Sequence, residues 1–132
     1  MLSAPDEYRQ FARSIKRVVL MDVLYRALQC DIRQLELQTF KLKQSVLQTL
    51  SYTSIQVERE LQGAKRQLRQ SGGHIIEVKQ KRDYREVRAR FRGFIYTQRF
   101  FNEWIKAECE EWLVRLWTGK TTSQTFSAFR SS

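Results

Sequence analysis

The sequence has few of the residues that build disulfide frameworks and metal sites. Its 132 residues include two cysteines and one histidine, His74. Cys30 and Cys109 lie far apart without C-x-x-C spacing, so we expect two reduced thiols in a cytoplasmic protein. A disulfide between them stays open from the sequence alone. A histidine-based zinc site would need ligands from unrelated segments, and we predict no metal and no cofactor.

Catalytic motifs are also missing. The single histidine stands beside the Gly72-Gly73 pair, and nothing in the sequence places an acid and a nucleophile around it. Glu108 and Glu111 share one predicted helix, and no facing acid is identifiable for carboxylate-based hydrolysis. Lys120 and Thr121 resemble the end of a phosphate-binding loop, but Val114 stands where that motif requires glycine. We therefore predict that the protein is not an enzyme.

Long apolar runs are absent as well. The run at 18–21 follows basic residues, as in a signal peptide, but Asp22 and Arg26 interrupt it and no small-residue cleavage site follows. No stretch approaches the ~20 apolar residues that cross a bilayer. We expect a protein that is neither secreted nor inserted in a membrane.

Proline occurs once and glycine five times, which excludes collagen-like and proline-rich architectures. With 42% apolar residues, the chain can instead bury the core of one domain. Ser3, Pro5 and the acidic pair Asp6 and Glu7 are typical of a helix start. From Tyr8 onward, apolar side chains recur every three or four residues, which predicts a long first helix.

Residues 1–71 are predicted to form a long helical hairpin. Asp31 is a candidate cap for a new helix, and the polar cluster at 51–54 is the candidate turn. Two heptad-like seams indicate helix packing, either within the chain or in a homodimer. Their members are Ile32, Leu35, Thr39, Leu42 and Val46, then Leu47, Leu50, Ser54, Val57, Leu61, Ala64 and Leu68. One helix running through Ser54 is the alternative, because the second seam crosses the candidate turn unbroken.

Beyond Gly72 and Gly73 the repeat of apolar side chains changes from the 3.6 residues of a helix to the 2 residues of a strand. Residues 74–81 and 84–96 predict a two-stranded β-hairpin, and residues 100–117 predict an amphipathic helix that packs on it within the same domain. Residues 118–132 predict a flexible tail. The predicted fold class is α+β, mainly α.

The positive charge is concentrated in this hairpin. The formal net charge is +10, and residues 65–99 carry 11 basic and 3 acidic side chains. In the second predicted strand, alternation places Arg88, Arg90 and Arg92 on one face with Phe94 and Tyr96. The opposite face carries Val87, Ala89, Phe91, Gly93 and Ile95. One basic face with interleaved aromatic rings is therefore expected.

Arginine forks suit phosphates, and aromatic rings stack on bases. We predict a small nucleic-acid-binding protein, for DNA or RNA, and a regulatory role is compatible with this. The predicted contact residues are Lys79, Lys81, Arg82, Tyr84, Arg85, Arg88, Arg90, Arg92, Phe94, Tyr96 and Arg99. One alternative is a helical adaptor whose basic face binds an acidic protein. Another is a solvated face neutralised by Glu103, Glu108, Glu110 and Glu111 of the following helix.

Overall fold

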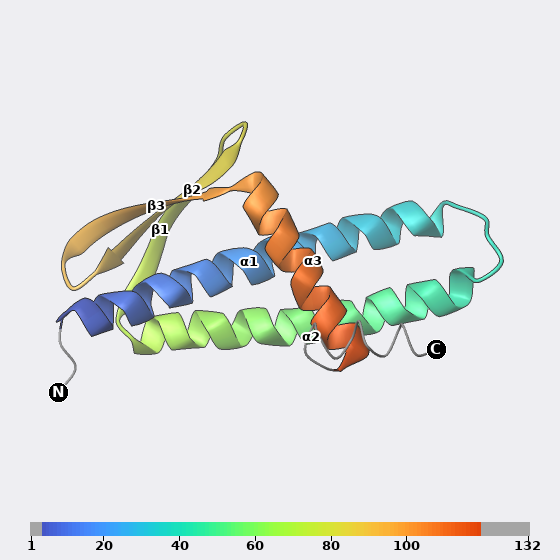
Figure 1. Cartoon of the computed structure of the whole chain (residues 1–132), viewed down its shortest axis with the longest axis horizontal. Coiled ribbons are helices and arrows are strands. Elements are labelled where there is room, and N and C mark those ends of the chain that lie inside the picture. Colours follow the sequence, from blue (N-terminus) through green and yellow to red (C-terminus); the bar gives the residue numbers. More distant parts are fainter. Residues whose placement is uncertain (1–3, 120–132) are drawn as a thin grey trace, which may run out of the picture.

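A computed structural model describes residues 4–119 as three helices and a three-stranded antiparallel sheet (Figure 1). The elements are α1 (Ala4–Glu36), α2 (Lys43–Gln70), β1 (Gly73–Gln80), β2 (Tyr84–Phe91), β3 (Phe94–Phe101) and α3 (Asn102–Thr118). The predicted α+β, mainly α class is confirmed. Ser3 and residues 120–132 of the predicted tail lie outside the described residues.

The long helices α1 and α2 form the predicted hairpin and lie side by side (Figure 1). The predicted break at Asp31 is wrong, because α1 continues to Glu36 and the chain reverses over residues 37–42. Lys43 Nζ donates a hydrogen bond to the Glu36 carbonyl oxygen at 2.7 Å, which places a cation at the negative end of the α1 dipole. This turn contains no proline or glycine, the residues that most strongly indicate a turn in a sequence.

The polar cluster at 51–54 lies inside α2 and is not a turn. Thr53 and Ser54 are buried, and each has a partner on another helix. Trp117 Nε1 of α3 donates to Thr53 Oγ1 at 2.8 Å, and Gln29 Nε2 of α1 donates to Ser54 Oγ. These hydroxyls therefore join helices, and the alternative of one helix through Ser54 is correct.

The second heptad-like seam forms the buried stripe of α2. Val57, Leu61, Ala64 and Leu68 are all at most 5% exposed and belong to the same core cluster as the apolar face of α1. This seam is covered within the chain. The homodimer stays a prediction.

The predicted second strand is two strands joined at Arg92 and Gly93. Both residues have positive φ, 53° and 79°, as in the two-residue type I′ turns of β-hairpins. Phe91 and Phe94 are paired on either side of the turn. The sheet thus has three strands in the order β1-β2-β3, where the sequence predicts two. Because the turn uses two residues, inward-facing positions change from odd numbers in β2 to even numbers in β3.

The apolar face of the sheet rests on the first turns of α1. Phe11 of α1 stacks on Phe91 with 4.6 Å between ring centroids, and Tyr8 contacts Tyr96 at 5.0 Å. Gly73, at the start of β1, lies so close that a Cβ atom there would stand 3.0 Å from Phe11 Cδ1. α3 contacts the same sheet at one edge, where Trp104 stacks on Phe100 at 5.9 Å.

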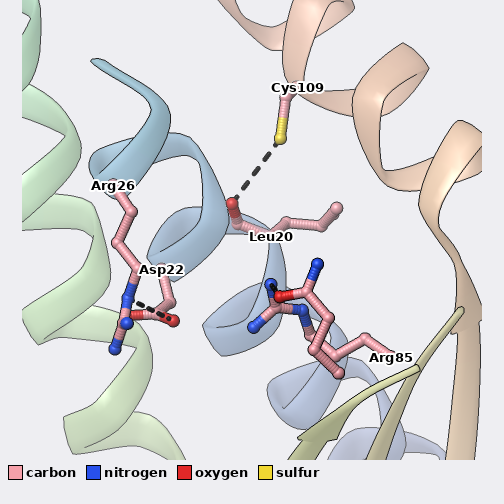
Figure 2. Close-up of polar contacts among 6 residues, drawn as sticks. Leu20, Asp22, Arg26, Arg85 and Cys109 are labelled. Atoms are coloured by element: carbon pink, nitrogen blue, oxygen red, sulfur yellow. Dashed lines mark hydrogen bonds and ion pairs between the residues drawn. The ribbon is translucent and has the colours of Figure 1, made fainter. Parts of the chain in front are cut away.

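Helix α3 crosses the α1–α2 hairpin obliquely (Figure 1). Cys109 Sγ lies 3.7 Å from the Leu20 carbonyl oxygen of α1 and donates to it (Figure 2). The helix ends at Gly119, whose φ of 67° is the left-handed conformation common at helix C-termini. None of the helices in residues 4–119 offers an apolar stretch long enough to span a bilayer.

Candidate nucleic-acid interface

The two faces of the sheet differ in what covers them. We call the inner face the one that carries buried Val87, Ala89 and Phe91, and the outer face the opposite one. Strand register assigns the remaining positions, because paired residues share a face. The outer face comprises His74, Glu77 and Lys79 of β1, Tyr84, Glu86, Arg88 and Arg90 of β2, and Ile95, Thr97, Arg99 and Phe101 of β3.

The outer face carries four Lys or Arg side chains and two Glu. Arg88 Nη1 lies 3.4 Å from Glu77 Oε2, and Arg99 Nε lies 3.2 Å from Glu86 Oε2. Lys79 also approaches Glu77, at 3.8 Å. Within residues 4–119, Arg90 has no ion pair. The face therefore keeps a positive excess, and its paired cations are held in place by acids of the same sheet.

Aromatic rings lie next to these cations. Tyr84 and Phe101 are directly opposite each other in the β2–β3 register, and Phe101 is 67% exposed. The Arg99 guanidinium carbon lies 5.9 Å from the Tyr84 ring centroid. Ile95, half exposed, pairs with Arg90 toward the other end of the strands. The outer face thus combines planar rings, guanidinium groups and exposed apolar surface.

The structure separates the residues that the sequence placed on one face. Arg88 and Arg90 are on the outer face, but Arg92 is in the β2–β3 turn, where it pairs with Glu7 of α1. Tyr96 is on the inner face, against Tyr8 and Phe11. Phe94 is exposed beside the turn but has inner-face register. The predicted grouping of Arg92, Phe94 and Tyr96 with Arg88 is wrong, because the turn at 92–93 reverses the alternation.

Arg85 also departs from the predicted basic face. It has the same parity as Val87, so it lies on the inner side of the sheet, and its Nη2 donates to Gln80 Oε1 at 2.9 Å. Figure 2 shows its side chain beside α1, away from the Asp22–Arg26 ion pair on that helix.

Lys81 and Arg82 lie in the exposed β1–β2 connection. This connection is fixed to the start of α3, because Asn102 donates its backbone N–H to Asp83 and its side-chain Nδ2 to the Arg82 carbonyl oxygen. The two cations are therefore held beside the Tyr84 end of the outer face.

The acids of α3 do not neutralise the sheet within the described residues. Glu111 pairs with Arg115 of its own helix, and no ion pair joins Glu103, Glu108 or Glu110 to a strand in residues 4–119. Glu77, Glu86 and Glu7 have that role instead. The sequence could not identify them, because ion pairing across strands depends on register.

Sequence reasoning missed Phe101 and Ile95 as outer-face residues. The Arg92-Gly93 pair could have indicated both, because a glycine at the second position of a two-residue loop is compatible with a tight hairpin turn. With the turn placed there, alternation in β3 brings positions 95, 97, 99 and 101 to the face of Arg88.

The cysteines and acids of the described chain form no metal-binding cluster, and one of the two thiols is buried. No group of three His, Cys, Asp or Glu side chains there is arranged to hold a metal ion. Both cysteines are free, Cys30 exposed and Cys109 buried. Burial, together with the negative charges of Glu108 and Glu110, raises the pKa of the Cys109 thiol from 9.0 to about 11. Because the thiolate is the nucleophilic form, this thiol is unreactive at neutral pH.

Comparison with known proteins gives one match. No curated protein and no solved structure matches the chain. A protein-family model described as "YhjD protein" matches residues 7–121, which include the whole sheet, α2, α3 and all but the first three residues of α1. The chain therefore belongs to the YhjD protein family.

Proposed function

We propose that the protein is a small, non-enzymatic, cytoplasmic protein that binds single-stranded nucleic acid on the outer face of its sheet. One observation carries the proposal: Tyr84 and Phe101 lie side by side next to the Arg99 guanidinium, on a face with a positive excess. Stacking of a base on an aromatic ring contributes about 1–3 kcal/mol and does not depend strongly on sequence. Guanidinium groups beside the rings would bind the flanking phosphates.

The dimensions of the face suit a short segment of one strand. From Tyr84 to Arg90 the chain advances six residues, or about 20 Å at about 3.3 Å per residue. A segment of a few nucleotides could lie along this line, with bases near Tyr84 and Phe101 and phosphates near Arg88 and Arg90. Lys81 and Arg82 extend the positive surface beyond the ring end.

The ion pairs on the face do not prevent binding. The Arg88 and Arg99 side chains are 41% and 65% exposed in their pairs with Glu77 and Glu86. The Arg88–Glu77 pair, in which Glu77 is 39% exposed, contributes roughly 0–1 kcal/mol, so a phosphate can replace that carboxylate at small cost. Glu86 is 18% exposed, so exchange of its carboxylate on Arg99 costs more. The free thiol of exposed Cys30 is consistent with a reducing compartment such as the cytoplasm.

The proposal is tested by anisotropy of a fluorescent mixed-sequence single-stranded oligonucleotide, titrated at several salt concentrations. The variant replaces Arg88, Arg90 and Arg99 by Gln. Each lost phosphate contact lowers the salt slope by about 0.7 on single strands, so we expect a slope smaller by about 2 and much weaker binding. The matched control replaces exposed Arg13, Arg33 and Arg59 of the long helices by Gln, with the same change in net charge.

Two results would contradict the proposal: no binding of the oligonucleotide at low salt, or equal losses in the two triple variants. The competing function of the outer face is binding of an acidic protein. The Phe101→Ala variant distinguishes this function from nucleic-acid binding. Loss of this exposed ring removes a stacking surface and should weaken oligonucleotide binding about tenfold, within the range expected for one stacked base. Binding that depends on charge alone would be unaffected by it.

A further inference from the structure

Arg85 is the inward-facing arginine of β2, and its charge is not fully satisfied by the protein. Its Nη2 donates to Gln80 Oε1, but its Nε atom is buried and has no hydrogen-bond partner in the described chain. An unpaired buried donor is destabilising, more so on a charged group. Arg88 and Arg90 of the same strand are on the opposite face. Arg85 also has no ion pair in residues 4–119, so its positive charge is without a carboxylate partner on the side of the sheet that faces the helices.

A cleft of about 490 Å³ opens beside this guanidinium, between α1, α3 and the β1–β2 end of the sheet. Its walls are mainly apolar and include Val23, Leu24 and Leu28 of α1 and Ile105 and Leu113 of α3. Arg85, Gln80, Asn102 and Lys106 also line it and supply hydrogen-bond donors. Clefts of about 300–1,000 Å³ with apolar walls and a few polar groups are typical of small-molecule sites.

We propose that this cleft binds an organic acid with one carboxylate and an apolar body. The carboxylate accepts charge-assisted hydrogen bonds from the guanidinium Nη groups of Arg85, which lines the cleft. The apolar body lies along Leu24, Leu28 and Ile105. This site is independent of nucleic-acid binding, because Arg85 and the outer face are on opposite sides of the sheet.

The charges of the lining select a monoanion over a phosphate. Arg85 and Lys106 are balanced by Asp31 and Glu110, which also line the cleft. Because the lining is neutral overall, a second negative charge on the ligand would be buried without a free cation, whereas one carboxylate lies beside Arg85. The neutral Cys109 thiol adds no charge to the wall.

The test is isothermal titration of the full chain with octanoate, with octanol and inorganic phosphate as comparison ligands. We expect saturable binding of octanoate, and binding at least about tenfold weaker for octanol, because a charge-assisted hydrogen bond is lost. Arg85→Gln should weaken octanoate binding at least about tenfold. Arg90→Gln, with the same charge change on the same strand but on the outer face, should leave it unchanged.

A second variant keeps the proposal falsifiable if Arg85→Gln does not fold. Ala27 is exposed and lines the cleft, so Ala27→Phe should fill it and weaken octanoate without touching the guanidinium. The proposal is overturned if octanoate shows no saturable binding, if octanol binds as well as octanoate, or if phosphate binds as well as octanoate. Equal effects of Arg85→Gln and Arg90→Gln would also overturn it, as would unchanged binding in the Ala27→Phe variant.

Discussion

The inner and outer faces of the sheet are made by the same three strands but have opposite roles. On the inner face Val87, Ala89 and Phe91 are at most 5% exposed, because they belong to the core that the sheet shares with the helices. On the outer face Ile95 and Phe101 are 50% and 67% exposed. Apolar residues occur on both faces, so hydrophobicity alone does not decide which face is buried. The position of the helices decides it, and the outer-face residues stay exposed.

This difference predicts that stability and binding depend on separate residues. Substitutions on the inner face should lower the free energy of unfolding, and those on the outer face should change binding at nearly constant stability. Matched substitutions, one on each face, test whether stability and binding are separate in this way.

The largest effect is expected for Phe11→Ala. Phe11 is fully buried and contacts Phe91 and Tyr96 beneath the sheet. Truncation of a buried Phe leaves a cavity and destabilises by about 3–5 kcal/mol. The outer-face match, Phe101→Ala, should change stability by less than about 0.5 kcal/mol. Urea unfolding followed by circular dichroism measures both, and similar losses in the two variants would show that the faces are not distinct.

The next effect concerns the close approach of β1 to the helices. A Cβ atom at Gly73 would stand 2.5 Å from Leu68 Cδ1, so Gly73→Ala forces buried side chains to move. Overpacking of this kind costs about 1–3 kcal/mol. At Gly63, inside α2, a Cβ atom would meet nothing beyond the backbone of its own helix, and Gly63→Ala should stabilise by about 0.5–1 kcal/mol through helix propensity. Opposite signs in thermal melts are the expected result.

The helical hairpin and the seam of α2 could be predicted because periodicity over many residues is a strong signal, whereas the predicted seam from Ile32 to Val46 is wrong because it crosses the turn at 37–42. Val57, Leu61, Ala64 and Leu68 were expected to form a seam, and they are buried in one. The turn at 37–42 could not be predicted, because its exposed Leu37 and Leu42 resemble packing residues. Thr53 and Ser54 resemble a turn, but their hydroxyls are satisfied by Trp117 and Gln29, which are distant in sequence.

The candidate interface was predicted only in part, because some of its contacts also depend on residues that are distant in sequence. Charge counting located the basic segment, and alternation placed Arg88 and Arg90 together. Arg92 and Gly93 interrupt that alternation, and their positive φ values follow from the need to pair Phe91 with Phe94. Register across strands then determined which glutamates pair with Arg88 and Arg99. Neither the turn nor the register is a property of residue type alone.

A smaller effect should come from a single polar atom on the inner face. Gln98 Oε1 is buried without a hydrogen-bond partner in residues 4–119. Gln98→Met removes the unpaired oxygen and keeps a similar unbranched side chain, so it should stabilise by about 1 kcal/mol. Gln62→Met on the exposed surface of α2 is the control and should have no measurable effect. A rise in the urea midpoint without a change in slope would agree, and a fall would show that Gln98 has a partner in solution.

The smallest effect on stability, and the clearest separation of the two faces, is expected for Glu86→Gln. The variant removes the carboxylate that pairs with Arg99 but leaves the exposed guanidinium beside Tyr84. Because Arg99 is 65% exposed but Glu86 only 18% exposed, the pair is only partly screened by solvent, and its loss should change the free energy of unfolding by up to about 1 kcal/mol. Oligonucleotide affinity should rise, because Arg99 no longer has to exchange a carboxylate for a phosphate and a repulsive charge is gone. Glu58→Gln, at an exposed position of α2, makes the same charge change away from the sheet. An equal rise in oligonucleotide affinity in this variant would show that only net charge matters.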